Sequence, residues 1–411
     1  MTDNPTAKAT PPFQYLITLD PLGLLYGSAG RFLSPENLVG RSGTHFPPTA
    51  ATLSGLFAAY YNDPTPEHQN HKETFDQLQL AGPFWAKSET PQDFHVPTPM
   101  HCLATMHPNH EDNDLQTGYV GDRLQYHAGD DQPIHWRNLA GEPPEDKFAR
   151  GTWVNISDWE TLSSTNKTTL ETIPVYTDPW INVPHLHPYL KPDERRVDSD
   201  RQRGSLFLEN GVQMIPDTCL VYLSNLPVAS VWYRFGGEGH MVDLQCHDLT
   251  PEHRSLLSRP LGNSFALITP AIWGSNRLSY RDPQLLKKGN PERHSLPEVD
   301  SDLKTPWTTD AILTERPTPF RYRLGHRKTK EGETIHEAHQ PKLLSRGRYA
   351  VPAGSVYVTQ ASDTTCWHDW PEDWFPKEGP SLKRWGCGLS LPLTGVMASE
   401  TAEKAVEGAI A

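Results

Sequence analysis

The chain of 411 residues carries 37 Lys and Arg against 50 Asp and Glu, and its formal net charge is −13. This overall charge excludes indiscriminate binding to nucleic acid. A hydrophobic content of 36%, with 39 Pro and 29 Gly, predicts many loops and few long helices. No run approaches the roughly 18 apolar residues of a membrane span, and residues 1–12 lack a hydrophobic signal core. We therefore expect a soluble, cytoplasmic protein without a membrane partner.

The charge is unevenly distributed along the chain. Residues 316–348 contain nine Lys or Arg and three Glu, a local charge of +6, which leaves −19 for all other residues. Aromatic residues alternate with the cations at the start of this basic segment, and that pattern suits a nucleic-acid strand or an acidic partner. We expect one face of the protein to bind RNA while another repels it.

The first element in chain order is a strand over residues 13–19, where apolar and other residues alternate with a period of two. A glycine-rich loop follows, and a helix is predicted from Leu53 to Tyr61, with Thr49 as its N-cap. Strand, loop and capped helix together are typical of an anion site, where Arg31 and Arg41 are available to a phosphate. The alternative is a structural loop over a core helix.

The rest of the chain mixes short strands with few helices. Residues 65–80 favour part of a second helix, and about 100–190 show no sustained period, which predicts a long irregular insertion. Further strands are predicted at 205–208, 219–223 and 265–269 and after Leu389, and two hairpins are predicted to join 231–235 to 240–246 and 348–351 to 355–358. A short helix is predicted from residue 251 and a weak one over 398–411. We expect four aromatic residues to be buried or to contact a partner: Trp367, Trp370, Trp374 and Phe375. This mixture predicts an α+β fold with ferredoxin-like units.

Motifs of enzyme chemistry are weak. The chain lacks G-x-x-x-x-G-K-[ST] and G-x-G-x-x-G, so nucleotide hydrolysis and dinucleotide binding have no support. Five cysteines without C-x-x-C spacing argue against a disulfide framework and a zinc knuckle, and His101, Cys102, His107 and His110 form a cluster without a second ligand pair. We expect no metal and no cofactor.

His45 is the one catalytic candidate. Beside the glycine loop, a neutral imidazole can take a proton from a ribose 2′-hydroxyl and start RNA cleavage. The alternative is a phosphate-contacting or structural histidine, because the sequence supplies no evident acid partner.

Several motifs, in their order along the chain, resemble one known family. They are Leu19-Asp20-Pro21-Leu22, Phe46-Pro47-Pro48 with Thr52-Leu53-Ser54-Gly55, Gly82-Pro83-Phe84, Pro97-x-Pro99, residues 236–239 (Gly-Gly-Glu-Gly) and residues 351–357. This collinear set is similar to the third subunit of the Cmr (type III-B) CRISPR effector, a member of the RAMP superfamily. The motifs span residues 19–357 and so cover most of the chain.

The resemblance implies two ferredoxin-like (RRM-like) domains with long loop insertions, which we place at 1–200 and 201–411. It implies a non-catalytic, RNA-binding subunit that grips the 5′ tag of the guide RNA, docks on the large polymerase-like subunit and joins backbone RAMP subunits in antiviral defence. The alternative is a metal-independent RAMP endoribonuclease acting through His45. The expected RNA contacts are Arg31, Arg41, Ser42, His45, Thr49, Arg346, Arg348, Arg384, Gly386 and Gly388.

Overall fold

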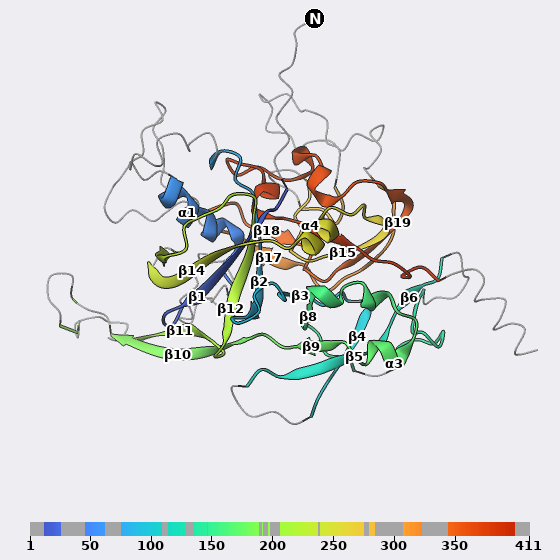
Figure 1. The fold of residues 1–411 in the computed structure, drawn as a ribbon. Helices are drawn as coiled ribbons and strands as arrows, with labels where there is room; N and C mark the ends of the chain where they lie inside the picture. Colours follow the sequence, from blue (N-terminus) through green and yellow to red (C-terminus); the bar gives the residue numbers. More distant parts are fainter. Residues whose placement is uncertain are drawn as a thin grey trace, which may run out of the picture.

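A computed structural model gives a fold that is mostly sheet with few helices, compatible with an α+β class (Figure 1). In the described part of the chain, no helix is long and apolar enough to cross a membrane. The structure describes residues 12–25, 46–61, 75–108, 114–128, 135–145, 147–188, 191, 196–197, 206–236, 239–274, 279–283, 307–322 and 344–398.

The larger sheet has ten strands, and all of its described pairings are antiparallel. In spatial order they are β13 (Trp232–Phe235), β14 (His240–Asp248), β1 (Tyr15–Pro21), β12 (Thr218–Ser224), β2 (Leu80–Lys87), β3 (His95–Pro97), β8 (Trp153–Asn155), β9 (Pro174–Tyr176), β5 (Thr117–Arg123) and β4 (Cys102–Met106). The predicted strand near the N-terminus and the predicted hairpin of β13 and β14 are both confirmed.

Helix α1 (Ala50–Tyr61) covers one face of this sheet. Its buried side chains include Leu53 and Phe57, which lie in one cluster with Ile17 of β1 and Tyr222 of β12. The i, i+3, i+4 spacing of its apolar residues therefore predicted both the helix and its buried side.

A second sheet of four strands, called the smaller sheet below, has the spatial order β16 (Thr309–Leu313), β19 (Val356–Asp363), β15 (Gly262–Leu267) and β20 (Ser390–Pro392), and three pairs of strands form sheets of their own among the described residues. Helix α4 (Pro251–Leu257) precedes it, with the Thr250 hydroxyl accepting from the His253 amide. The short 3₁₀ helices η5 (Trp367–Asp369), η6 (Glu372–Trp374) and η7 (Leu382–Trp385) lie between β19 and β20.

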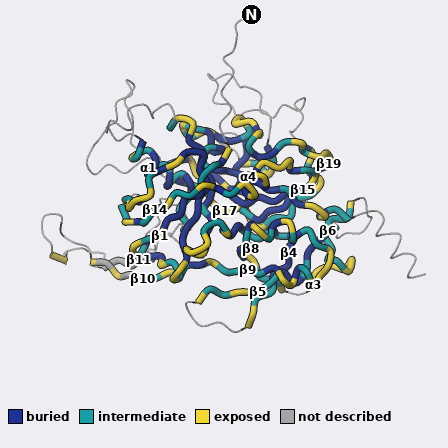
Figure 2. Tube along the Cα trace, in the orientation of Figure 1, coloured by how far each residue is buried: buried dark blue, intermediate teal, exposed yellow. Residues whose placement is uncertain are grey.

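Aromatic packing joins the ten-stranded and four-stranded sheets in the larger of two clusters of buried residues. Figure 2 shows the buried segments gathered in the middle of the molecule. Phe13, beside β1, stacks on Trp367 with ring centroids 5.8 Å apart. Trp370 and Phe375 are buried with Trp367, and Trp374 is partly buried against them, as expected from the sequence. Large aromatic side chains bury about 150 to 250 Å² each, so this cluster is a principal source of cohesion between the sheets.

The predicted hairpin between 348–351 and 355–358 is wrong. Strand β18 (Arg348–Ala350) pairs with β17 (Thr318–Phe320), whereas β19 pairs with β15 and β16. Tyr357 and Val358 of β19 are fully buried, and such a strand needs a partner on both sides to pair its backbone groups. Distant strands supply those partners, and a short turn in the sequence does not decide the pairing.

The range 100–190, for which we expected an irregular insertion, contains regular elements. Besides β4, β5, β8 and β9 it holds β6 (Gln125–Tyr126), β7 (Trp136–Arg137), η3 (Ile156–Asp158), η4 (Thr161–Ser163), α3 (Lys167–Leu170) and β10 (Trp180–Pro188). Most of its strands are too short to set up a readable period. β10 pairs with β11 (Leu206–Met214) in a long hairpin that extends from the body (Figure 1). The helices predicted over 65–80 and 398–411 fall mostly outside the described residues.

Candidate nucleic-acid interface

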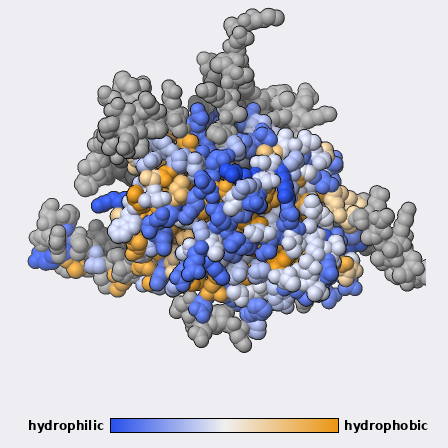
Figure 3. All heavy atoms as spheres, viewed as in Figure 1, coloured by the Kyte–Doolittle hydropathy of each residue, from blue (hydrophilic) through white to orange (hydrophobic). Residues whose placement is uncertain are grey.

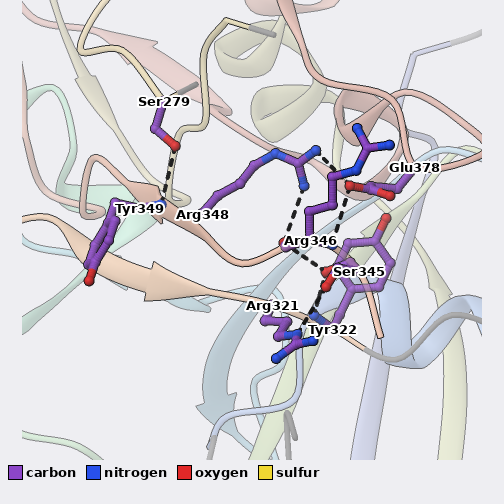
Figure 4. A network of polar contacts seen from close by, with 8 residues as sticks. All are labelled: Ser279, Arg321, Tyr322, Ser345, Arg346, Arg348, Tyr349 and Glu378. Carbon is purple, nitrogen blue, oxygen red and sulfur yellow. Dashed lines mark hydrogen bonds and ion pairs between the residues drawn. The ribbon is translucent and has the colours of Figure 1, made fainter. Parts of the chain in front are cut away.

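The hairpin of β17 and β18, a two-stranded sheet of its own, leads into a polar network whose central side chains are buried (Figure 4). Ser345 is its centre. The Tyr322 amide donates to the Ser345 hydroxyl at 3.0 Å, the Ser345 amide donates to the Tyr322 carbonyl at 2.8 Å, and Arg321 Nε donates to the Ser345 carbonyl at 2.9 Å. These bonds fix the backbone that carries the basic side chains.

Arg348 is buried and paired with an acid. Its Nη2 lies 2.6 Å from Glu378 Oε1, and the two side chains are 2% and 10% exposed. Arg348 Nη1 also donates to the Arg346 carbonyl at 3.3 Å, and the Arg346 amide donates to Glu378 Oε1 at 3.4 Å. The guanidinium that we expected to contact RNA therefore holds the chain around Arg346.

The outer side of this hairpin is open. Tyr349 follows Arg348 in β18, so its side chain points to the opposite face of the strand, away from the Arg348 and Glu378 pair (Figure 4). Its side chain is 59% exposed, and its amide donates to the Ser279 hydroxyl at 3.3 Å. Arg346 and Arg316 are exposed on the same two chain segments. We did not expect Tyr349 from the sequence, although its place beside two arginines in the basic segment was a usable signal.

Tyr322 connects this network to the glycine loop of residues 386–388. Burial raises the pKa of its hydroxyl, and the Glu378 charge adds to that effect. The Arg348 charge lowers the pKa of Tyr322, and the Cys387 charge raises it. Burial raises the pKa of the Cys387 thiol, and the Arg348 charge lowers it, so these side chains lie near one another. The structure therefore brings Arg346, Arg348 and residues 386–388 into one region.

Gly386 and Gly388 are packed into the core of this region. A Cβ at Gly386 would lie 2.5 Å from the Cα of Ala81, and a Cβ at Gly388 would lie 3.0 Å from the Trp273 ring. The Thr269 hydroxyl donates to the Gly386 carbonyl. The two glycines thus serve close packing in this structure, where we expected contact with a phosphate.

The guanidinium of Arg384 also forms hydrogen bonds within the protein. Its Nε donates to the Leu78 carbonyl at 2.9 Å and its Nη2 donates to the Phe75 carbonyl at 3.2 Å. Burial lowers the pKa of its guanidinium. These bonds tie η7 to the chain that enters β2, near Tyr61 at the end of α1.

Thr49 lies at the other end of α1. Its carbonyl accepts from the Thr52 amide at 2.8 Å, but its hydroxyl has no hydrogen-bond partner in the described part of the chain. A helix of twelve residues is about 18 Å long, so Thr49 and Arg384 do not share a site. Arg31, Arg41, Ser42 and His45 lie outside the described residues, as does most of the glycine loop of the predicted anion site.

The described residues contain no group of three or more His, Cys, Asp or Glu side chains that could hold a metal. Burial lowers the pKa of His101 to about 3 and raises that of Cys102 to about 12. His107 is exposed, and His110 falls outside the described residues. A buried, protonated thiol is a poor metal ligand, since metal binding requires the thiolate.

Residues 24–394 match the protein family described as CRISPR-associated protein (Cas_Cmr3). The chain belongs to the Cas_Cmr3 family. This membership confirms the resemblance that the collinear motifs indicated, that of a subunit of a type III-B Cmr effector.

No curated protein matches the chain. Among solved structures, a cryo-EM structure of the type III-B Cmr-beta bound to cognate target RNA contains a chain that is 12% identical, with a TM-score of 0.39 and coverage of 84% of this chain and 86% of that chain. A structure of the same assembly with target RNA and AMPPnP, in state 1, contains a chain that is 10% identical, with a TM-score of 0.40 and the same two coverages. The assignment to Cas_Cmr3 rests on the family match.

Proposed function

We propose that this Cas_Cmr3 protein is a non-catalytic subunit that holds the 5′ tag of the guide RNA in a type III-B ribonucleoprotein. The observation that carries the proposal is the exposed Tyr349 beside Arg346, on a backbone fixed by the buried pair of Arg348 and Glu378. Family membership supports the setting, since the family is one of CRISPR-associated proteins.

In this proposal the exposed and the buried arginines act differently. The exposed Arg346 and Arg316 contact phosphate oxygens, and the Tyr349 ring stacks on a splayed base. Arg348 positions them, because its charge is already neutralised by Glu378 in a buried site. The expected contacts of Arg31, Arg41, Ser42 and His45 remain part of the proposal, with phosphates held at the glycine loop before α1.

The two ferredoxin-like domains are part of the same proposal. Their support is the strand order. A ferredoxin-like βαββαβ unit places its strands in the order 4-1-3-2, with all neighbours antiparallel. The order β14, β1, β12, β2 follows this pattern in the larger sheet, with α1 between its first and second strands, and β20, β15, β19, β16 follow it in the smaller sheet.

Domain boundaries follow from these two units. The first reaches β14, which ends at Asp248, and the second begins with α4, so we place the boundary near residue 249 and not near 200. The remaining proposed partners are the large polymerase-like subunit and the backbone RAMP subunits, in the cytoplasm.

Purification of the tagged protein from its native host tests the proposal, with sequencing of bound RNA and identification of bound proteins. We expect short RNAs that share one 5′ tag, together with a large polymerase-like subunit. A matched preparation with Tyr349→Ala and Arg346→Gln should lose RNA while keeping the bound proteins. Recovery of the protein without RNA would overturn the proposal.

A further inference from the structure

One face of the larger sheet is open where β13, β14 and β1 lie side by side. Residues directly opposite each other in neighbouring strands share a face. Trp232 of β13 lies opposite Asp243 of β14, which lies opposite Asp20 of β1. In the next row Arg234 lies opposite Met241, and the Leu22 amide donates to the Met241 carbonyl at 3.1 Å.

The other face of these strands is covered. Phe235, Val242 and Leu244 are buried in the cluster that α1 completes. On the open face, by contrast, Trp232 is 64% exposed, and Leu22 and Met241 are 52% and 40% exposed. Figure 3 shows that apolar residues lie scattered among hydrophilic ones on the face of the molecule that it draws. Several large apolar side chains exposed together mark an interaction site more often than scattered single ones do.

The edge of the sheet is open as well. β13 is the terminal strand of the ten, and it pairs with β14 alone within the described part of the chain. Its outer backbone groups are therefore available to an added strand, a common mode of peptide recognition.

Acidic groups surround the apolar side chains. Burial raises the pKa of Asp20, and the charges of Asp243 and Asp217 raise it further, so both carboxylates lie close enough to Asp20 to repel its charge. None of the three forms a salt bridge within the described residues. Asp217 also lines a cavity of about 490 Å³ whose wall includes Glu89, Asp114 and one cation, Lys87.

We propose that this open face, built on Trp232, Met241 and Leu22 and bordered by Asp20, Asp217 and Asp243, docks an extended segment of a partner protein that presents Lys or Arg beside apolar side chains. Cations of the segment face the carboxylates, and its apolar side chains cover Trp232. An RNA strand is disfavoured here, because Arg234 is one cation against several carboxylates that repel phosphate. The inference does not depend on RNA binding at Tyr349.

Photo-crosslinking within the native effector complex tests the inference. The full-length chain carries p-benzoylphenylalanine in place of Trp232, an exposed position where the change leaves the core intact. Irradiation should yield a protein adduct that survives ribonuclease, and mass spectrometry should place it on a peptide with Lys or Arg flanked by apolar residues. The double variant Asp20→Asn, Asp243→Asn should lower the adduct yield about fivefold, since two exposed ion pairs of about 0.5 kcal/mol each are together worth about 1 kcal/mol.

The same crosslinker in place of Tyr349 is the matched control. An RNA adduct at 349 with a protein adduct at 232 supports both the RNA site and the docking surface. No protein adduct at 232, an adduct to RNA there, or a yield unchanged by the two Asn substitutions overturns the docking surface. If the crosslinker at position 349 forms no RNA adduct, that result counts against the proposed function and leaves the docking surface unaffected.

Discussion

The guanidinium of Arg348 donates to the carboxylate of Glu378 at 2.6 Å, in a site where both side chains are almost inaccessible to water. Thirty residues separate the two in the chain. The Glu378 carboxylate also accepts from the Arg346 amide, so one buried acid positions both the hidden and the exposed arginine of the candidate interface.

Removal of one member of this pair should destabilise the protein strongly. We expect Glu378→Ala to lower the free energy of unfolding by about 3 kcal/mol or more, because it leaves an unpaired buried charge. Urea denaturation measures the change. Glu315→Ala is the matched control: its pair with Arg150 is exposed, so it should cost less than about 1 kcal/mol. Equal losses in the two variants would contradict the structural role of the buried pair.

Loss of the Tyr349 ring should weaken RNA binding. Stacking of a base on an aromatic side chain contributes about 1 to 3 kcal/mol, so Tyr349→Ala should raise the Kd for guide RNA by roughly 5- to 150-fold. Filter binding with tagged RNA measures the change. Tyr349→Phe keeps the ring and should bind almost as the unmodified protein does. A large loss with Phe as well would point to the hydroxyl and away from stacking.

Arg346 should act through phosphate charge. We expect Arg346→Gln to weaken RNA binding and to reduce the slope of log K against log salt by about 0.7, the value for one phosphate contact on a single strand. Tyr349→Ala should leave that slope unchanged, which separates the two contributions. An unaltered slope in Arg346→Gln would remove Arg346 from the phosphate contacts.

Gly386 should tolerate no side chain. Its φ is +71°, and a Cβ there would lie 2.5 Å from the Cα and Cβ of Ala81. Gly386→Ala should therefore lower the free energy of unfolding by about 2 to 4 kcal/mol, from strain and overpacking together. Gly379→Ala has a φ of +84° but open space around it, so it should cost only about 1 to 2 kcal/mol. Thermal and urea unfolding of the two variants should reveal this difference.

His95 should make stability depend on pH. Burial lowers its pKa to about 4 from the 6.5 expected in the unfolded chain. Between these values the unfolded state binds more protons, so the free energy of unfolding should fall as the pH drops from about 6.5 to 4, by about 3 kcal/mol. His95→Phe keeps the stack on Trp85 and should reduce the slope of that part of the profile, while the buried His101, whose pKa is lowered to about 3, keeps its own contribution. A profile unchanged by His95→Phe would exclude this histidine as the cause.

Local pattern was sufficient for several elements. The alternation of residues 13–19 predicted β1, the helical spacing of Leu53 and Phe57 predicted α1, and the glycines after Phe235 predicted the hairpin of β13 and β14. Each depends on residues close in sequence, which is why a period or a turn reveals it. The collinear motifs likewise indicated the family, because their order along the chain is a property of the sequence alone.

Tertiary structure decided how distant segments meet. It pairs β18 with β17, places Glu378 of another segment beside Arg348, and packs Gly386 against Ala81 of β2. Some of the residues that we expected at an RNA surface are therefore buried in the core. Burial and pairing of this kind depend on which segment fills each space and satisfies each backbone group. The amino-acid pattern by itself determined the family and the local elements, whereas three-dimensional packing determined that Tyr349 stands exposed above a buried ion pair.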